Sequence, residues 1–188
     1  MTPLDGNIFS GHSMEQIAQR AGVGVGTLRE EFDLLGAPFD DRGDRADDAL
    51  RALRVAMSTR EPAYDGPHYS FSGLVIDPCA VQPDVPIWIG GRTLRSLRRA
   101  VELADGWTPF AVTPEQVKDW LGRFELPDGF EVVLPPARPL DPMGAPDQVM
   151  AELALLRSAG ATIVKVSLVH HSLEHYLEQL ASLAALPI

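Results

Sequence analysis

The stretch of sequence that decides the fold is residues 83–110, PDVPIWIGGRTLRSLRRAVELADGWTPF. It opens with a short apolar run that ends in two glycines and closes on a second apolar run, GWTPF. Between them, residues 93–104 carry apolar side chains at intervals of three and four. The two runs have the length and composition of strands, and the middle segment has the period of an amphipathic helix.

The same alternation continues on both sides of this stretch. Strand-like runs occur at five places, which are residues 22–26, 85–90, 106–110, 131–135 and 162–169. Because these runs are apolar throughout, no face of the expected sheet is suited to water, and helices should cover it. The pattern is typical of an α/β fold with parallel strands, either doubly wound or closed into a barrel.

Three of the expected helices carry start signals. Thr93 and Ser172 stand directly before helical periods, where a hydroxyl can accept a hydrogen bond from a free backbone N–H group. Thr113 is followed by Pro114 and then by Gln116, which is the spacing of a capping box. Residues 61–84 interrupt the alternation with turn and aromatic residues, and we expect an inserted hairpin or a long loop there.

Composition narrows the class of function. Acidic residues outnumber basic ones by 26 to 16, for a formal net charge of -10, so phosphate backbones and anionic lipid surfaces are repelled. We therefore expect neither nucleic acid nor a membrane as a partner. The single cysteine, Cys79, and the lack of a signal-peptide pattern favour a cytoplasmic protein, and no Cys/His cluster has the spacing of a metal site.

Residues 83–110 resemble the most diagnostic segment of the luciferase-like monooxygenase superfamily, especially its F420-dependent branch, which uses a deazaflavin coenzyme. Residues 22–53, GVGVGTLREEFDLLGAPFDDRGDRADDALRAL, resemble the family's fourth strand and the helix after it. Residues 142–166, PMGAPDQVMAELALLRSAGATIVKV, resemble its late helix and last strand. The resemblance implies a partial TIM (β/α)8 barrel with about five of eight βα units, parallel strands and outer helices.

The resemblance also sets the expected domains and activity. Residues 1–21 are expected to be a divergent N-terminal segment, and residues 22–188 the C-terminal part of a luciferase-like barrel, with the hairpin-like insertion at 61–84. The implied activity is that of an oxidoreductase or monooxygenase that transfers a hydride between coenzyme F420, or alternatively FMN, and a small organic substrate. In such enzymes the redox chemistry belongs to the cofactor. We further expect a homo-oligomer.

The expected cofactor site lies where the strand at 85–90 turns into a helix. Gly90 and Gly91 allow the backbone to approach a ligand closely, and the start of the helix at Thr93 offers N–H groups and the positive end of a dipole to a phosphate. Arg92 could add positive charge, and Thr113, which follows the neighbouring strand end, could cap its own helix and also contact the cofactor tail. A plain strand-to-helix turn would use the same two glycines.

The catalytic residues are not determined by the sequence. His170 follows the last expected strand and His68 lies in the insertion, and either imidazole could donate a proton to a substrate. Histidines that are merely exposed, or that have a structural role, would occur at the same positions in the sequence.

Two other classes of function remain open. The family's first three βα units have no counterpart before Gly22, which would fit a non-catalytic remnant or an oligomerising interaction protein. Residues 13–32, SMEQIAQRAGVGVGTLREEF, also resemble a helix-turn-helix of a DNA-binding regulator, although the expected recognition helix is acidic.

Overall fold

A computed structural model describes residues 27–82 and 84–187 of the 188-residue chain. The chain divides into two compact units, residues 1–46 and 47–188. The first contains helix α2 (Thr27–Leu34) and the start of α3 (Arg42–Ser58), while the strands and all later helices belong to the second. The strand expected at 22–26 and most of the expected helix-turn-helix lie outside the described residues.

The described part of the first unit is held by a small aromatic contact. The rings of Phe32 and Phe39 meet edge to face, with 5.5 Å between their centroids. The Arg29 guanidinium lies over the Phe39 ring and also binds the Asp40 carboxylate at 2.6 Å. These contacts fix the turn that follows α2.

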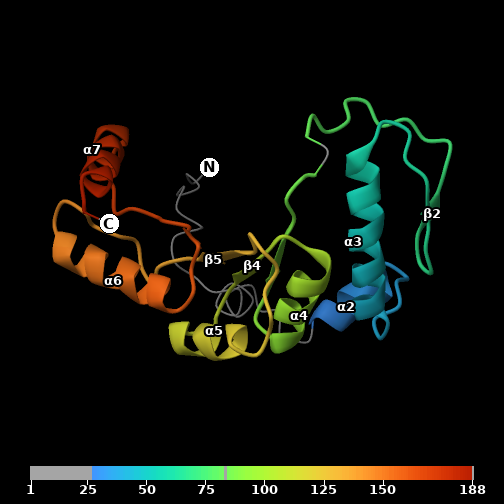
Figure 1. The fold of residues 1–188 in the computed structure, drawn as a ribbon, viewed down its shortest axis with the longest axis horizontal. Coiled ribbons are helices and arrows are strands. Elements are labelled where there is room, and N and C mark those ends of the chain that lie inside the picture. Colours follow the sequence, from blue (N-terminus) through green and yellow to red (C-terminus); the bar gives the residue numbers. More distant parts are fainter. Residues whose placement is uncertain (1–26, 83, 188) are drawn as a thin grey trace, which may run out of the picture. The chain divides into compact units, whose positions relative to one another are not determined.

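The second unit is built on a four-stranded parallel sheet (Figure 1). Its strands are β3 (Trp88–Gly91), β4 (Gly106–Pro109), β5 (Glu131–Leu134) and β6 (Ile163–Val164), and they are neighbours in sequence order. Helices α4 (Leu94–Leu103), α5 (Pro114–Leu121) and α6 (Pro146–Ser158) connect them, and α7 (Leu173–Ala184) follows. Sequential parallel strands joined by helices are the arrangement of part of a (β/α)8 barrel, so the α/β prediction is confirmed with four of the expected strands.

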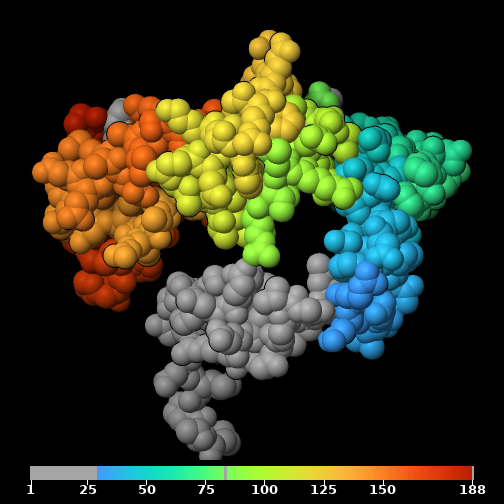
Figure 2. Space-filling model, turned by 90° about the horizontal axis from the view of Figure 1, so that it is seen from below, coloured from blue at the N-terminus to red at the C-terminus, as the bar shows by residue number. Residues whose placement is uncertain are grey.

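The main core lies between this sheet and the connecting helices. Strand register places Ile89, Trp107 and Val132 in one row across β3, β4 and β5, and all three are buried. Leu97 of α4 and Val117 of α5 pack against this row. In the space-filling view, the segment from α4 through α5 to α6 forms an uninterrupted surface from green to orange (Figure 2).

The opposite face of β3 and β4 is different. Trp88 and Gly90 point away from this core and are exposed. The indole Nε1 of Trp88 donates a hydrogen bond to Glu131 Oε2 at 2.6 Å, across Gly106. A side chain at Gly106 would meet the Trp88 ring, since an added Cβ would lie 2.9 Å from Trp88 Cδ1.

The last strand is shorter than its sequence predicts. We expected one strand over residues 162–169, but β6 ends at Val164 and only Leu168 returns to parallel pairing, in an isolated bridge with Leu140. The loop after β5 takes the place of a longer β5–β6 ladder, because Leu140 N–H donates to Ser167 O and Leu140 O accepts from Val169 N–H, each at 2.8 Å. Leu140 and Leu168 then form a second small core with Val149 and Leu153 of α6.

Residues 61–84 contain a short antiparallel pair, β1 (Tyr64–Asp65) and β2 (Ser70–Phe71). The pair is attached to α3 by one buried carboxylate. Asp48 accepts hydrogen bonds from the Tyr64 hydroxyl at 2.5 Å and from the backbone N–H groups of His68 and Tyr69 at 2.8 and 2.9 Å. Within the part of the chain that the structure describes, no helix is both long and apolar enough to cross a membrane.

Candidate functional site

The expected cofactor site is the turn from β3 into α4. Gly90 and Gly91 end the strand, Arg92 is exposed, and Thr93 is the N-cap of the helix in extended conformation. The Thr93 hydroxyl accepts a hydrogen bond from Ser96 N–H at 3.3 Å, as the spacing predicts. The strand end and the helix start are therefore joined by a single residue, Arg92.

Only one of the two glycines is required by the local geometry. Gly91 has φ +155°, and a Cβ added there would overlap the Cβ and Oγ atoms of Ser96. Among the residues that the structure describes, a Cβ added at Gly90 would meet only Thr108 O, at 3.8 Å, which is ordinary contact. The close approach that glycine permits at residue 91 is used by the protein itself, and with respect to the described residues Gly90 leaves open space on the exposed face of β3.

The end of β4 lies beside this turn. The backbone N–H of Phe110 donates to Gly91 O at 3.3 Å, and Ala111 then turns the chain with φ +52°. Thr113 follows as the N-cap of α5, and its capping box with Gln116 is present in both directions, at 3.3 and 3.1 Å. Thr93 and Thr113 thus begin neighbouring helices at the same edge of the sheet.

The two helix starts differ in charge. Glu115 lies in the first turn of α5, where hydrogen bonds from its own backbone amide and from the Thr113 hydroxyl lower the pKa of its carboxyl. This helix start therefore already holds an anion of its own. The first turn of α4 contains no acidic residue and carries Arg95 instead. Every other helix that the structure describes has an acidic residue in its first turn: Glu30, Asp44, Glu115, Asp147 and Glu174.

The expected proton donors are not brought to this turn by any described contact. His170 is exposed after the last strand; its Nδ1 donates to Leu168 O at 2.8 Å and its ring meets Tyr176 edge-on. His68 is half-buried in the insertion, where its backbone N–H binds Asp48. Their catalytic role stays a prediction.

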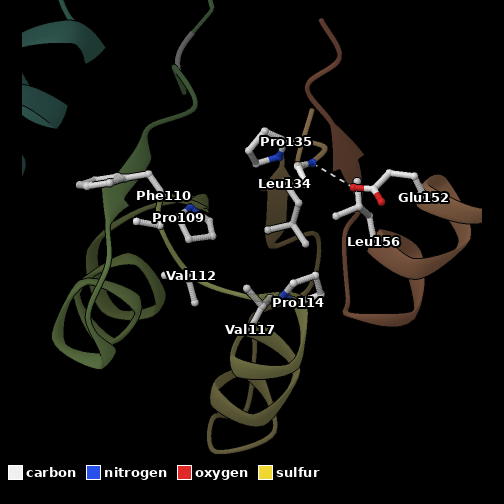
Figure 3. Close-up of a pocket in the computed structure, with 11 residues that line it drawn as sticks. Pro109, Phe110, Val112, Pro114, Val117, Leu134, Pro135, Glu152 and Leu156 are labelled. Carbon is white, nitrogen blue, oxygen red and sulfur yellow. Dashed lines mark hydrogen bonds between the residues drawn. The ribbon is translucent and has the colours of Figure 1, made fainter. Parts of the chain in front are cut away.

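A cavity of about 110 Å³ adjoins the end of β4 (Figure 3). Its wall is formed by apolar side chains from β4, α5, β5 and α6, and Leu134 and Leu156 turn toward Pro114 and Val117. Glu152 is the one charged residue of its lining, and its Oε1 accepts a hydrogen bond from Ala137 N–H at 2.9 Å. Pockets for drug-sized ligands are about 300 Å³ or more, so this cavity is too small for a flavin ring.

Sequence reasoning missed Ser96. Its side chain is buried, its Oγ donates to Thr93 O at 2.7 Å, and it accepts from the Trp107 indole Nε1 at 3.2 Å. The only local signal was its position three residues after the N-cap, which does not reveal a partner in the next strand.

Comparison with known proteins places the turn inside a recognised family segment. A family model described as luciferase-like monooxygenase matches residues 20–126. Two uncharacterized proteins of Mycobacterium tuberculosis (strain ATCC 25618 / H37Rv) are similar. One is 33% identical over 109 residues, covering 57% of this chain and 37% of the relative; the other is 31% identical over 97 residues, covering 51% and 33%. The matched part spans about a third of the length of these relatives.

A solved structure has a similar fold. The crystal structure of monooxygenase RslO1 from Streptomyces bottropensis superposes with a TM-score of 0.62 at 16% sequence identity, covering 84% of this chain and 64% of that chain. At this identity the likeness concerns the fold alone, and it extends beyond residue 126 to much of the second unit.

Proposed function

Given that this chain belongs to the luciferase-like monooxygenase family, we propose that it is part of an oxidoreductase that transfers a hydride between coenzyme F420, or alternatively FMN, and a small organic substrate. Coenzyme F420 is preferred because residues 83–110 most resemble the F420-dependent branch. When bound, either cofactor supplies the redox chemistry, and the protein binds and orients it. For this chain's own residues, we propose that Gly90, Gly91, Arg92 and Thr93 bind the cofactor phosphate.

The observation that carries the proposal is the charge at the start of α4. The first turn of a helix presents free N–H groups and a partial positive charge, each favouring a nearby anion by about 1 kcal/mol. In a chain with a net charge of -10, acidic side chains occupy this position in the other described helices. Helix α4 has no acidic residue of its own in its first turn, and Arg92 and Arg95 lie at its start.

Thr113 has a weaker part in the proposal. Its hydroxyl and its backbone N–H are both engaged in the capping box, and Glu115 occupies the same helix start. We therefore propose that Thr113 does not bind the phosphate but fixes the conformation of the chain between β4 and α5, beside the phosphate. The small cavity next to it does not fit the ring system, so the ring is proposed to lie on the exposed face of β3, where no described side chain fills the space beside Gly90.

The test places an acidic side chain at the start of α4. Arg95→Glu gives this helix the first-turn carboxylate that its neighbours have, and we expect affinity for FMN to fall by about tenfold because the dipole is then satisfied and the anion repelled. Arg98→Glu makes the same change of charge one turn further along the exposed side of the helix and should weaken FMN by less than about threefold. Calorimetric titration of FMN and coenzyme F420 against both variants and wild type measures this.

Riboflavin separates the phosphate from the ring. It lacks the phosphate, so its affinity should be equal in Arg95→Glu and wild type. If Arg95→Glu and Arg98→Glu weaken FMN equally, or riboflavin suffers as much as FMN, the phosphate does not bind at this helix start. Failure of wild type to bind either cofactor would reject the proposed function for this chain.

A further inference from the structure

Ser96 connects the turn after β3 to the neighbouring strand. Its Oγ has a donor and an acceptor role at once, since it donates to Thr93 O at 2.7 Å and accepts from Trp107 Nε1 at 3.2 Å. Trp107 is fully buried in β4, and Ser96 is 7% exposed. Neither water nor another side chain is needed to complete these two hydrogen bonds.

The turn is also shaped around the Ser96 side chain. The space that a Cβ at Gly91 would occupy is filled by the Cβ and Oγ of Ser96. Gly91 and Ser96 therefore fit each other as a pair. Because Trp107 is anchored in the main core, the position of Ser96 is set by β4 as well as by its own helix.

Hydrogen bonds within the protein engage two of the carbonyl groups of the turn, those of Gly91 and Thr93. Gly91 O accepts from Phe110 N–H at 3.3 Å, and Thr93 O accepts from Ser96 Oγ and from the N–H groups of Ser96 and Leu97. Carbonyl oxygens carry partial negative charge and would repel an anion. With both oxygens held by donors within the protein, the turn can present N–H groups instead.

We propose that Ser96 is a positioning residue. Through its hydrogen bond to Trp107 and its contacts with Gly91 and Thr93, it fixes the Gly91–Thr93 turn relative to β4, in a conformation that can bind an anion. The anion-binding half of this inference rests on the proposed function, while the effect of Ser96 on the conformation of the turn does not. Ser96 does not contact the ligand; it acts through Thr93 and Gly91.

The experiment uses the full chain, inorganic phosphate as the probe, and amide spectra by nuclear magnetic resonance. Ser96→Ala keeps the Cβ but removes the hydroxyl, and Trp107→Phe keeps a ring but removes the indole N–H. In each variant the amide resonances of Gly91 to Thr93 should move without phosphate, and the dissociation constant for phosphate should rise about fivefold. The dissociation constant of the double variant for phosphate should exceed that of Ser96→Ala by no more than about twofold, because the two changes break the same connection. In wild type, phosphate should also shift the Trp107 indole N–H resonance.

Ser158→Ala is the matched control. Ser158 Oγ in α6 donates to Leu155 O at 2.8 Å, which is the same kind of hydrogen bond as that from Ser96 Oγ to Thr93 O, the carbonyl three residues earlier. Ser158 is exposed and lies far along the chain from the turn. Its removal should leave phosphate affinity unchanged. If Ser96→Ala does not fold, Trp107→Phe is judged by the same criteria.

The outcomes separate the two proposals. If wild type binds phosphate and both variants bind it equally well, Ser96 does not position the turn and the proposed site stands. If wild type does not bind phosphate but Ser96→Ala and Trp107→Phe displace the turn amides, the turn is positioned by Ser96 and the proposed phosphate site is wrong. Additive losses in the double variant would overturn the connection through Trp107.

Discussion

Gly90 and Gly91 are adjacent, but the structure restricts them very differently. An alanine at residue 91 would combine an unfavourable backbone angle with overlap on Ser96, and we expect Gly91→Ala to lower the free energy of unfolding by about 2–3 kcal/mol. Gly90→Ala has room and an ordinary backbone angle, so it should change the same quantity by less than about 1 kcal/mol. Urea unfolding of the two variants measures the difference. If Gly91→Ala lowers the free energy of unfolding by no more than about 1 kcal/mol, as expected for Gly90→Ala, then Ser96 moves aside at little cost.

For single residues, the sequence predicts contacts between near neighbours in the chain, but not contacts between residues of different elements. The caps Thr93, Thr113 and Ser172 are confirmed, because an N-cap and its N–H partner lie within three residues of each other. The link from Ser96 to Trp107 joins a helix to the following strand and depends on how the two pack. No spacing rule within one element contains that information.

Among the elements, the pair β1–β2 depends on a single carboxylate, which makes its attachment sensitive to acid. Burial alone raises the pKa of Asp48, but hydrogen bonds from the Tyr64 hydroxyl and from the amides of His68 and Tyr69 outweigh it, so the pKa lies below its ordinary value. A lowered pKa in the folded state contributes stability above the ordinary value of about 3.9, and this stability is lost as the pH falls through the lower, folded value.

Asp48→Asn tests this attachment. The amide cannot accept from three donors as the carboxylate does, so at pH 7 the variant should unfold more easily than wild type, and the His68 and Tyr69 amide resonances should move. The difference in unfolding free energy between the two proteins should be constant from pH 7 to 5 and shrink below about pH 4. Asp65→Asn, an exposed carboxylate of the same strand pair, is the control and should show neither effect. A difference that does not depend on pH would exclude the charge of Asp48 as the cause.

The order of elements could be predicted from the sequence, while the extent of the last strand could not. The last residues of β3 and β4 fall within one residue of the expected ones, whereas β3 begins at Trp88, three residues after its expected start at residue 85. For residues 162–169, apolar character continues to Val169, yet pairing beyond Val164 is decided by competition with the loop around Leu140. Such competition involves residues about 25 positions apart, which a local period does not describe.

For the whole molecule, we predict self-association. Among the described residues, β3 and β6 are each paired on one side only, and Trp88, Val166 and Val169 beside them are 45%, 37% and 45% exposed. Unpaired edges flanked by apolar side chains favour contact with another copy. Sedimentation velocity over a range of concentrations should show species larger than the monomer, and a hydrophobic dye should bind.

The near-isosteric changes Val166→Thr and Val169→Thr, made together, should shift the distribution toward the monomer. Val81→Thr alters an equally apolar and fully exposed residue in the insertion and should have no effect. A compact wild-type monomer that binds no dye would contradict the prediction.

The depth of the three tryptophans gives the molecule an optical property. Trp88 is exposed, Trp120 is half-buried, and Trp107 is fully buried with its ring centroid 6.1 Å from that of Trp120. The strong short-wavelength transitions of two indoles at this separation and an inclination of 42° couple, and they should produce a pair of bands of opposite sign in far-ultraviolet circular dichroism. Since one indole of that pair is hydrogen-bonded to Ser96, a displacement of the turn after β3 changes the coupling. The protein therefore reports the state of this turn by its own absorption of polarised light, without any label.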